Sequence, residues 1–140
     1  MILELVSIND SENAVRGDVV WRMEEAMNAH DLDALVDCFT EDFRSDLPIH
    51  PGRSFVGREH VRNNWAGIFA RVPDLSATVL QSVAEGGQAW AEWEIGGTTV
   101  AGERYLSRGV SIIEFRDGRA ASVRFYLDDV DPSDGSEAGR

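Results

Sequence analysis

The spacing of apolar residues changes once along this chain, at Pro73, and that change limits the folds open to it. Before Pro73, apolar side chains recur every three or four residues, as they do in amphipathic helices. From Leu75 onward they alternate with polar side chains, as in β-strands with one buried face. Helices gathered on one face of an antiparallel sheet make an α+β domain. We therefore predict an α+β fold in which a curved antiparallel sheet forms a cone and three helices from the N-terminal half pack on it.

The helical half divides into three segments. The first covers residues 11–29, the second follows the capping residue Asp31, and the third begins after Gly57 and stops before Pro73. The residues expected to face inward are Val15, Val19, Met23 and Met27 in the first segment, Leu32, Leu35, Val36 and Phe39 in the second, and Val61, Trp65, Ile68, Phe69 and Val72 in the third.

A short extended segment, residues 43–47, lies between the second and third helices. Pro48 and Pro51 cannot donate to a sheet ladder, so this segment is expected at a sheet edge or bend. Four strands follow Pro73 as an antiparallel meander, and Asp117-Gly118 is a hairpin turn signal between the last two. The alternating apolar residues are Leu75, Ala77, Val79 and Val83, then Ala89, Ala91, Trp93 and Ile95, and finally Ala121, Val123, Phe125 and Leu127.

Length and charge restrict the organisation and the partners. At 140 residues the chain fits one domain, predicted over residues 11–128, after an N-terminal extension (1–10) and before an acidic, disordered tail (129–140). A net charge of −12 without any lysine argues against nucleic acid and anionic membranes as partners. No apolar run is long enough to cross a bilayer. A single cysteine, Cys38, and the lack of a secretion signal favour a cytoplasmic protein.

Stretches from most of the chain resemble the SnoaL-like branch of the nuclear transport factor 2-like superfamily, which includes ketosteroid isomerases and polyketide cyclases. They are "NAHDLDALVDCFTEDF" (28–43), "FVGREHVRNNW" (55–65), "RVPDL" (71–75), "AEWEIGGT" (91–98) and "RGVSIIEFRDGRAASVRFYLD" (108–128). The resemblance covers about residues 12–128. It implies a cone-shaped α+β domain, often a homodimer, with a pocket between the sheet and the helices.

The resemblance also shows where the known catalytic groups of this superfamily would fall. Ketosteroid isomerases place a base before a proline in the first strand, with donors on the first helix and a later strand. The matching positions here are Leu47, Met23 and the neighbourhood of Ser111. The acid of SnoaL-type cyclases falls on Phe125, and further epoxide hydrolase positions fall on Trp93 and Ile95. Because most of these side chains are apolar, the usual acid/base groups of those enzymes are not expected here.

The remaining polar candidates lie in "FRSDLPIHPG", residues 43–52, where Asp46 is the candidate base and Arg44 and His50 support it. Arg44 and Asp46 are two residues apart in an extended segment, so they point the same way and can pair. Asp46 is one residue out of the isomerase register, and a one-residue step turns a side chain to the other face. The residues expected to line the pocket are Met23, Phe39, Trp65, Trp93, Ile95 and Phe125.

Two functions stay open at this point. The first is binding of a small apolar molecule in the cone, with cofactor-independent acid/base chemistry of the cyclase, isomerase or hydratase type as an extension. The alternative is a non-catalytic ligand-binding or dimerisation module, favoured by apolar Met23 and Phe125 at positions that carry a donor and an acid in the enzymes. We expect no cofactor and no metal. A homodimer is expected, with Trp21 and Tyr126 as candidate contact residues.

Overall fold

The computed structural model describes residues 19–131. The first helix is described over residues 19–29. It is followed by α2 (Leu32–Asp37), β1 (Phe39–Asp46), the 3-10 helix η1 (Pro51–Arg53), β2 (Phe55–Val56), α3 (Arg58–Arg71), β3 (Ser76–Glu85), β4 (Gln88–Thr98), β5 (Arg104–Arg116) and β6 (Arg119–Asp129). The predicted extension (1–10), the start of the first helix and the tail beyond residue 131 lie outside the described residues. Asp129, predicted as the first tail residue, still belongs to β6.

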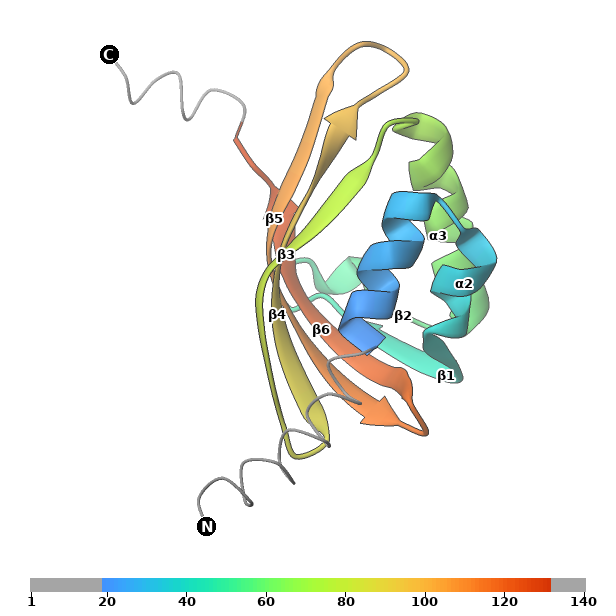
Figure 1. The fold of residues 1–140 in the computed structure, drawn as a ribbon, viewed down its shortest axis with the longest axis vertical. Helices are drawn as coiled ribbons and strands as arrows, with labels where there is room; N and C mark the ends of the chain where they lie inside the picture. Colours follow the sequence, from blue (N-terminus) through green and yellow to red (C-terminus); the bar gives the residue numbers. More distant parts are fainter. Residues whose placement is uncertain (1–18, 132–140) are drawn as a thin grey trace, which may run out of the picture.

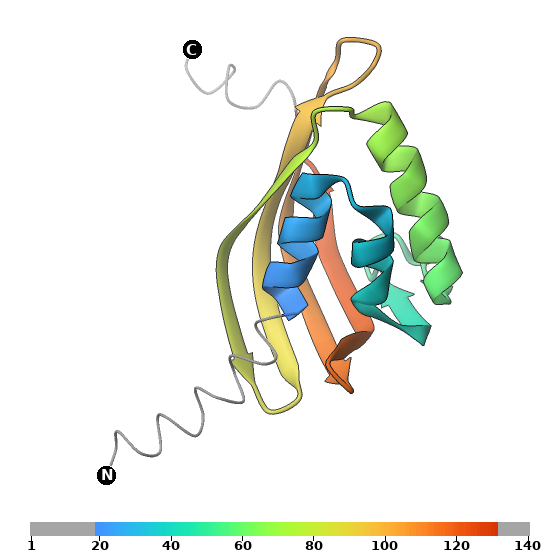
Figure 2. The same cartoon turned by 45° about the vertical axis from the view of Figure 1, so that its right-hand side comes forward.

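The six strands form one open sheet in the order β2-β1-β6-β5-β4-β3. All three helices cover the same face of this curved sheet (Figures 1 and 2). The α+β prediction is therefore confirmed, and β3 to β6 form the predicted antiparallel meander. The sheet is mixed rather than wholly antiparallel, because β1 runs parallel to β6. The long stretch of chain between these two strands makes a parallel pairing possible.

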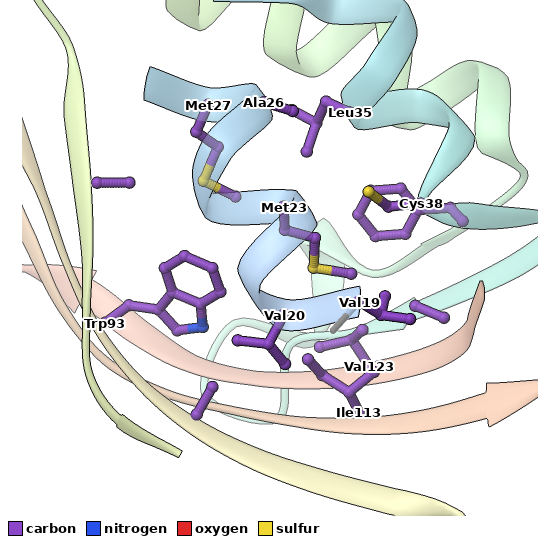
Figure 3. Close-up of a cluster of buried hydrophobic side chains, with 14 of the residues drawn as sticks. Val19, Val20, Met23, Ala26, Met27, Leu35, Cys38, Trp93, Ile113 and Val123 are labelled. Carbon is purple, nitrogen blue, oxygen red and sulfur yellow. The ribbon is translucent and has the colours of Figure 1, made fainter. Parts of the chain in front are cut away.

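Buried apolar side chains fill the space between the first helix and the concave face of the sheet. Figure 3 shows Val20 and Met23 of this helix facing Trp93, Ile113 and Val123 of the sheet.

Local signals in the sequence set where the helices begin. The Asp31 carboxylate caps α2 by accepting from the backbone N–H of Ala34 at 3.1 Å. None of the helices described in residues 19–131 is long and apolar enough to cross a membrane.

Phe39 was predicted in the second helix and is instead the first residue of β1. Helix α2 ends at Asp37, and the carbonyl of Cys38 accepts a hydrogen bond from the backbone N–H of Ala120 at 2.8 Å. The helix ends here because the backbone pairs with β6 from this point, although the apolar period predicted that the helix would continue. Phe39 remains buried, as expected.

Val83 was predicted to share the inner face of β3 and is instead exposed, at 69% of its full surface. The pairing of β3 with β4 shifts register between Val79 and Gln81. An extra residue at such a bulge turns the side chains that follow it to the opposite face. Leu75, Ala77 and Val79, which precede the bulge, are buried as predicted.

Candidate functional site

A cavity of about 580 Å³ lies between the concave face of the sheet and the helices. Pockets that bind small molecules usually have volumes of roughly 300–1,000 Å³. Its wall comes from the first helix, from α3, from the segment around η1, and from strands β1, β2, β4, β5 and β6. The cavity is therefore large enough to hold a small organic molecule.

Most of the cavity wall is apolar and aromatic. The six residues predicted to line a pocket, Met23, Phe39, Trp65, Trp93, Ile95 and Phe125, all lie on this wall. Phe43 joins them and makes edge-to-face contacts with two neighbours, at centroid distances of 4.6 Å to Phe39 and 6.2 Å to Phe55. Such a wall suits a ligand with a large apolar surface.

Three buried serines lie on the inner wall, Ser45, Ser107 and Ser111, and the hydroxyl of Ser107 donates to the carbonyl of Asp128 at 3.1 Å. The indole N–H of Trp93 donates to Ser111 Oγ at 2.9 Å, and because indole can only donate, Ser111 accepts and its own proton can be donated elsewhere. Ser45 is 1% exposed, and its Oγ has no hydrogen-bond partner among residues 19–131. A buried hydroxyl without a partner costs about 1–3 kcal/mol, so Ser45 is a candidate for contact with a polar ligand atom.

Polar side chains gather at the exposed rim of the cavity. The lining residues that are exposed to solvent are Gly52, Arg53, Ser54, His60 and Asn64. His60 stacks on Phe55 with ring centroids 4.1 Å apart. Tyr105 lines the cavity from β5, and burial raises the pKa of its phenol above the usual value. At neutral pH this phenol therefore keeps its proton and can donate a hydrogen bond.

The three candidate catalytic residues do not line the cavity. Arg44 and Asp46 do pair, with 3.3 Å between Arg44 Nε and Asp46 Oδ2. Side chains alternate along β1, and Ser45 and Leu47 line the cavity, so Arg44 and Asp46 point to the opposite face. His50 lies just before η1 and pairs elsewhere. Leu47, the position that the resemblance matched to the isomerase base, lies on the cavity wall, and Asp46 does not.

His50 forms a side-chain contact that sequence reasoning did not find. Its Nε2 lies 2.7 Å from Oδ2 of Asp128, near the end of β6. The hydrogen bond from His50 is the main cause that lowers the pKa of the Asp128 carboxyl, and the backbone N–H of Asp129 and the charge of Arg53 lower it further. The pair ties the segment before η1 to β6 beside the rim.

Replacing Asp128 with asparagine is expected to lower stability modestly at pH 6 and to have a smaller effect as the pH falls toward 2.5. A carboxyl whose folded pKa is depressed stabilises the fold above its unfolded pKa, about 4, and loses this contribution as the pH falls through the lower folded pKa. Urea unfolding of both proteins between pH 6 and pH 2.5 measures the difference. A gap that stays constant over this range would show that the variant acts through something other than the Asp128 charge.

Several residues of this site carry no sequence signal. Arg53, Ser54 and Asn64 are ordinary polar residues in the sequence, and only the path of the chain brings them to the rim. Strand alternation could have identified Ser45, because it predicts that the Ser45 side chain points to the face of the strand opposite that of Asp46. Across residues 19–131, no three His, Cys, Asp or Glu side chains are grouped closely enough to hold a metal ion.

Comparison with solved structures finds several relatives of similar size. An IdmH variant with a truncated 96–104 loop is 27% identical, with a TM-score of 0.68 over 81% of this chain and 92% of its own. A proposed SnoaL-like polyketide cyclase from Jannaschia sp. CCS1 is 20% identical, with a TM-score of 0.69 over 83% of this chain and 87% of its own. An LEH-like epoxide hydrolase from M. tuberculosis is 17% identical, with a TM-score of 0.71 over 84% and 85%. The last two similarities show a shared fold.

Sequence comparison gives the family directly. No curated protein matches the sequence. The family model of the SnoaL-like domain matches residues 20–123, which include the first helix, α2, α3 and the cavity-lining strands up to Val123. The fold, the position of the cavity and this match agree, and the chain belongs to the SnoaL-like domain family.

Proposed function

We propose that this protein binds an apolar small molecule in the cavity between its sheet and its helices. The observation that carries the proposal is a cavity of about 580 Å³ with a largely apolar and aromatic wall. Burying such a surface against a ligand is favourable by roughly 25 cal/mol per Å² of apolar area. The unpartnered Ser45 hydroxyl and the Ser111 hydroxyl supply the few polar contacts that orient a ligand in such pockets.

Catalysis by Asp46 with Arg44 and His50 stays a prediction and is not part of this proposal. A general base must come within hydrogen-bond reach of the proton that it removes. The Asp46 carboxylate pairs with Arg44 on the face of β1 opposite the cavity. Relatives of this fold include a proposed polyketide cyclase and an epoxide hydrolase, so the fold accommodates small-molecule chemistry in other proteins.

Filling part of the cavity is expected to weaken binding of a neutral apolar probe. Ile68 lies half-buried on α3 and lines the cavity, so Ile68→Trp places a larger side chain in the space. The affinity for N-phenyl-1-naphthylamine, measured by its fluorescence enhancement, should fall about ten-fold, which corresponds to the burial of roughly two methylene groups.

The matched control is Asn63→Trp, which adds the same side chain to the exposed face of the same helix. This variant should bind the probe as the wild type does. Equal affinity of the wild type and Ile68→Trp would mean that the probe binds outside the cavity. Failure of the wild type to bind any apolar probe would contradict the proposed function.

The outer face of the sheet favours a second candidate function, self-association as a homodimer. Val83, Trp90 and Tyr126 are exposed there, and Trp90 and Tyr126 lie opposite Ile112 and Val110 on β5. Exposed apolar residues that are contiguous across strands are typical of protein interfaces. Sedimentation equilibrium of the wild type and Trp90→Glu tests this candidate. A monomeric wild type at micromolar concentration would exclude a stable dimer.

A further inference from the structure

The wall of the cavity contains no acidic side chain among the described residues, although Asp and Glu make up 25 of the 140 residues. The protein carries a net charge of −12, which repels anions from most of its surface. The charged side chain on the cavity wall is Arg53, and the neighbouring rim residues His60 and Asn64 are also potential donors. The charge at the rim is thus opposite in sign to that of the whole protein.

The carboxylates that flank the rim in the sequence are engaged with other side chains. The pairs are Asp46 with Arg44, Glu59 with Arg62, and Asp128 with His50. The charge of Arg53 lowers the pKa of Asp128, yet its guanidinium forms no ion pair and no side-chain hydrogen bond with any of residues 19–131. Arg53 is therefore a cation at the rim without a carboxylate partner in the described part of the chain.

Backbone contacts hold Arg53 in place at the rim. It ends η1, in which its N–H donates to the carbonyl of His50 at 2.8 Å and the N–H of Ser54 donates to the carbonyl of Pro51 at 3.1 Å. Ser54 Oγ in turn accepts from the N–H of Leu47 at 3.0 Å. The pair of His50 with Asp128 fastens the same segment to β6. A charged group on a fixed turn loses less freedom on binding than one on a mobile loop.

We propose that the cavity takes an apolar monocarboxylic acid, with its apolar body inside and its carboxylate at the rim on Arg53. The guanidinium can form two parallel hydrogen bonds with a carboxylate, and the donors of Ser54 and Asn64 lie on the same rim. The apolar wall holds the rest of the molecule, so this inference rests on the proposed function. It adds the charge and the orientation of the ligand.

The test compares two probes of nearly equal shape, 2-naphthoate and its neutral isostere 2-naphthamide. Their dissociation constants are measured by quenching of tryptophan fluorescence at low ionic strength. Because the Arg53 side chain is exposed and the contact is screened by water, we expect the wild type to prefer the carboxylate by about five-fold. Raising NaCl to 0.5 M should remove most of this preference without changing the affinity for the amide.

Arg53→Gln should bind both probes equally, because it removes the charge and leaves a shorter, neutral side chain that can still donate a hydrogen bond. Arg124→Gln is the matched control. It changes the net charge by the same amount, and Arg124 lies between two cavity-lining residues of β6, so its side chain points to the outer face. This variant should keep the preference of the wild type.

Each outcome is decisive for the inference. Equal binding of both probes to the wild type, or a preference that survives in Arg53→Gln, would overturn it and leave the proposed function intact. Absence of naphthoate binding to a protein that binds N-phenyl-1-naphthylamine would overturn it as well. Absence of binding of all three probes would contradict the proposed function, and the inference with it.

Discussion

Replacing Gly109 with alanine is expected to destabilise the domain severely. Gly109 lies in the middle of β5, between Trp93 on β4 and Leu127 on β6, with a φ of +150°. A Cβ there would lie 2.0 Å from the backbone oxygen of Tyr126 and 2.6 Å from Cα of Leu127. Backbone atoms of a paired strand cannot move aside as the end of a flexible side chain can.

The overpacking and the strained φ together should cost at least about 4 kcal/mol, a large share of the 5–15 kcal/mol that stabilises a typical domain. The melting temperature of Gly109→Ala, followed by circular dichroism, should fall by at least about 12 °C if the protein folds at all. Gly87→Ala is the control, because Gly87 has no atom within 4 Å of an added Cβ. A melting temperature of Gly109→Ala close to that of Gly87→Ala would show that β6 can shift at little cost.

Truncating Phe43 to alanine is expected to have the second largest effect. Phe43 is 1% exposed on β1, where its ring contacts Phe39 and Phe55 edge to face. Removing a buried phenylalanine ring loses the transfer free energy of its carbons and leaves a void, at a cost of about 3–5 kcal/mol. Phe43 also lines the cavity between the sheet and the helices, so the void would enlarge a space that is already open. Urea unfolding of the variant and the wild type measures the loss.

Phe43→Leu separates the loss of packing from the loss of a specific aromatic contact. Leucine keeps most of the buried apolar volume but cannot make the edge-to-face contacts. These contacts contribute about 0.5–1.5 kcal/mol in addition to the burial of apolar surface. This variant should therefore be clearly more stable than Phe43→Ala. Equal destabilisation by both substitutions would mean that the aromatic geometry, rather than buried volume, determines the contribution of Phe43.

The position of Asp46 shows how much of a site can be predicted from the periodicity of a strand. Strand alternation predicted correctly that Arg44 and Asp46 share a face and can pair. It did not predict which face of β1 lines the cavity. Alternation requires only that neighbouring side chains point to opposite faces, whichever of the two faces is the inner one. Ser45 and Leu47 turned out to face the cavity, since β1 is anchored in register against both β2 and β6. That register is a long-range property of the sheet.

The rim residues show a different limit. Arg53 follows Pro51 in the sequence and reads as part of a polar loop, yet η1 and the pair of His50 with Asp128 bring it to the cavity. His50 and Asp128 are separated by 78 residues, so no local pattern relates them. Contacts of this kind depend on how two distant elements pack, and their side chains can be recognised as partners only after folding.

Local patterns in the sequence predict the α+β class, the three helices, the antiparallel meander and six apolar residues that lie on the cavity wall. These follow from hydrophobic period, capping residues and turn signals, which act over a few neighbouring residues. Long-range packing sets the parallel pairing of β1 with β6, the bulge that exposes Val83, and the side of β1 that Asp46 occupies. Each of these depends on pairing between segments distant in the chain, where a shift of one residue reverses every side chain that follows.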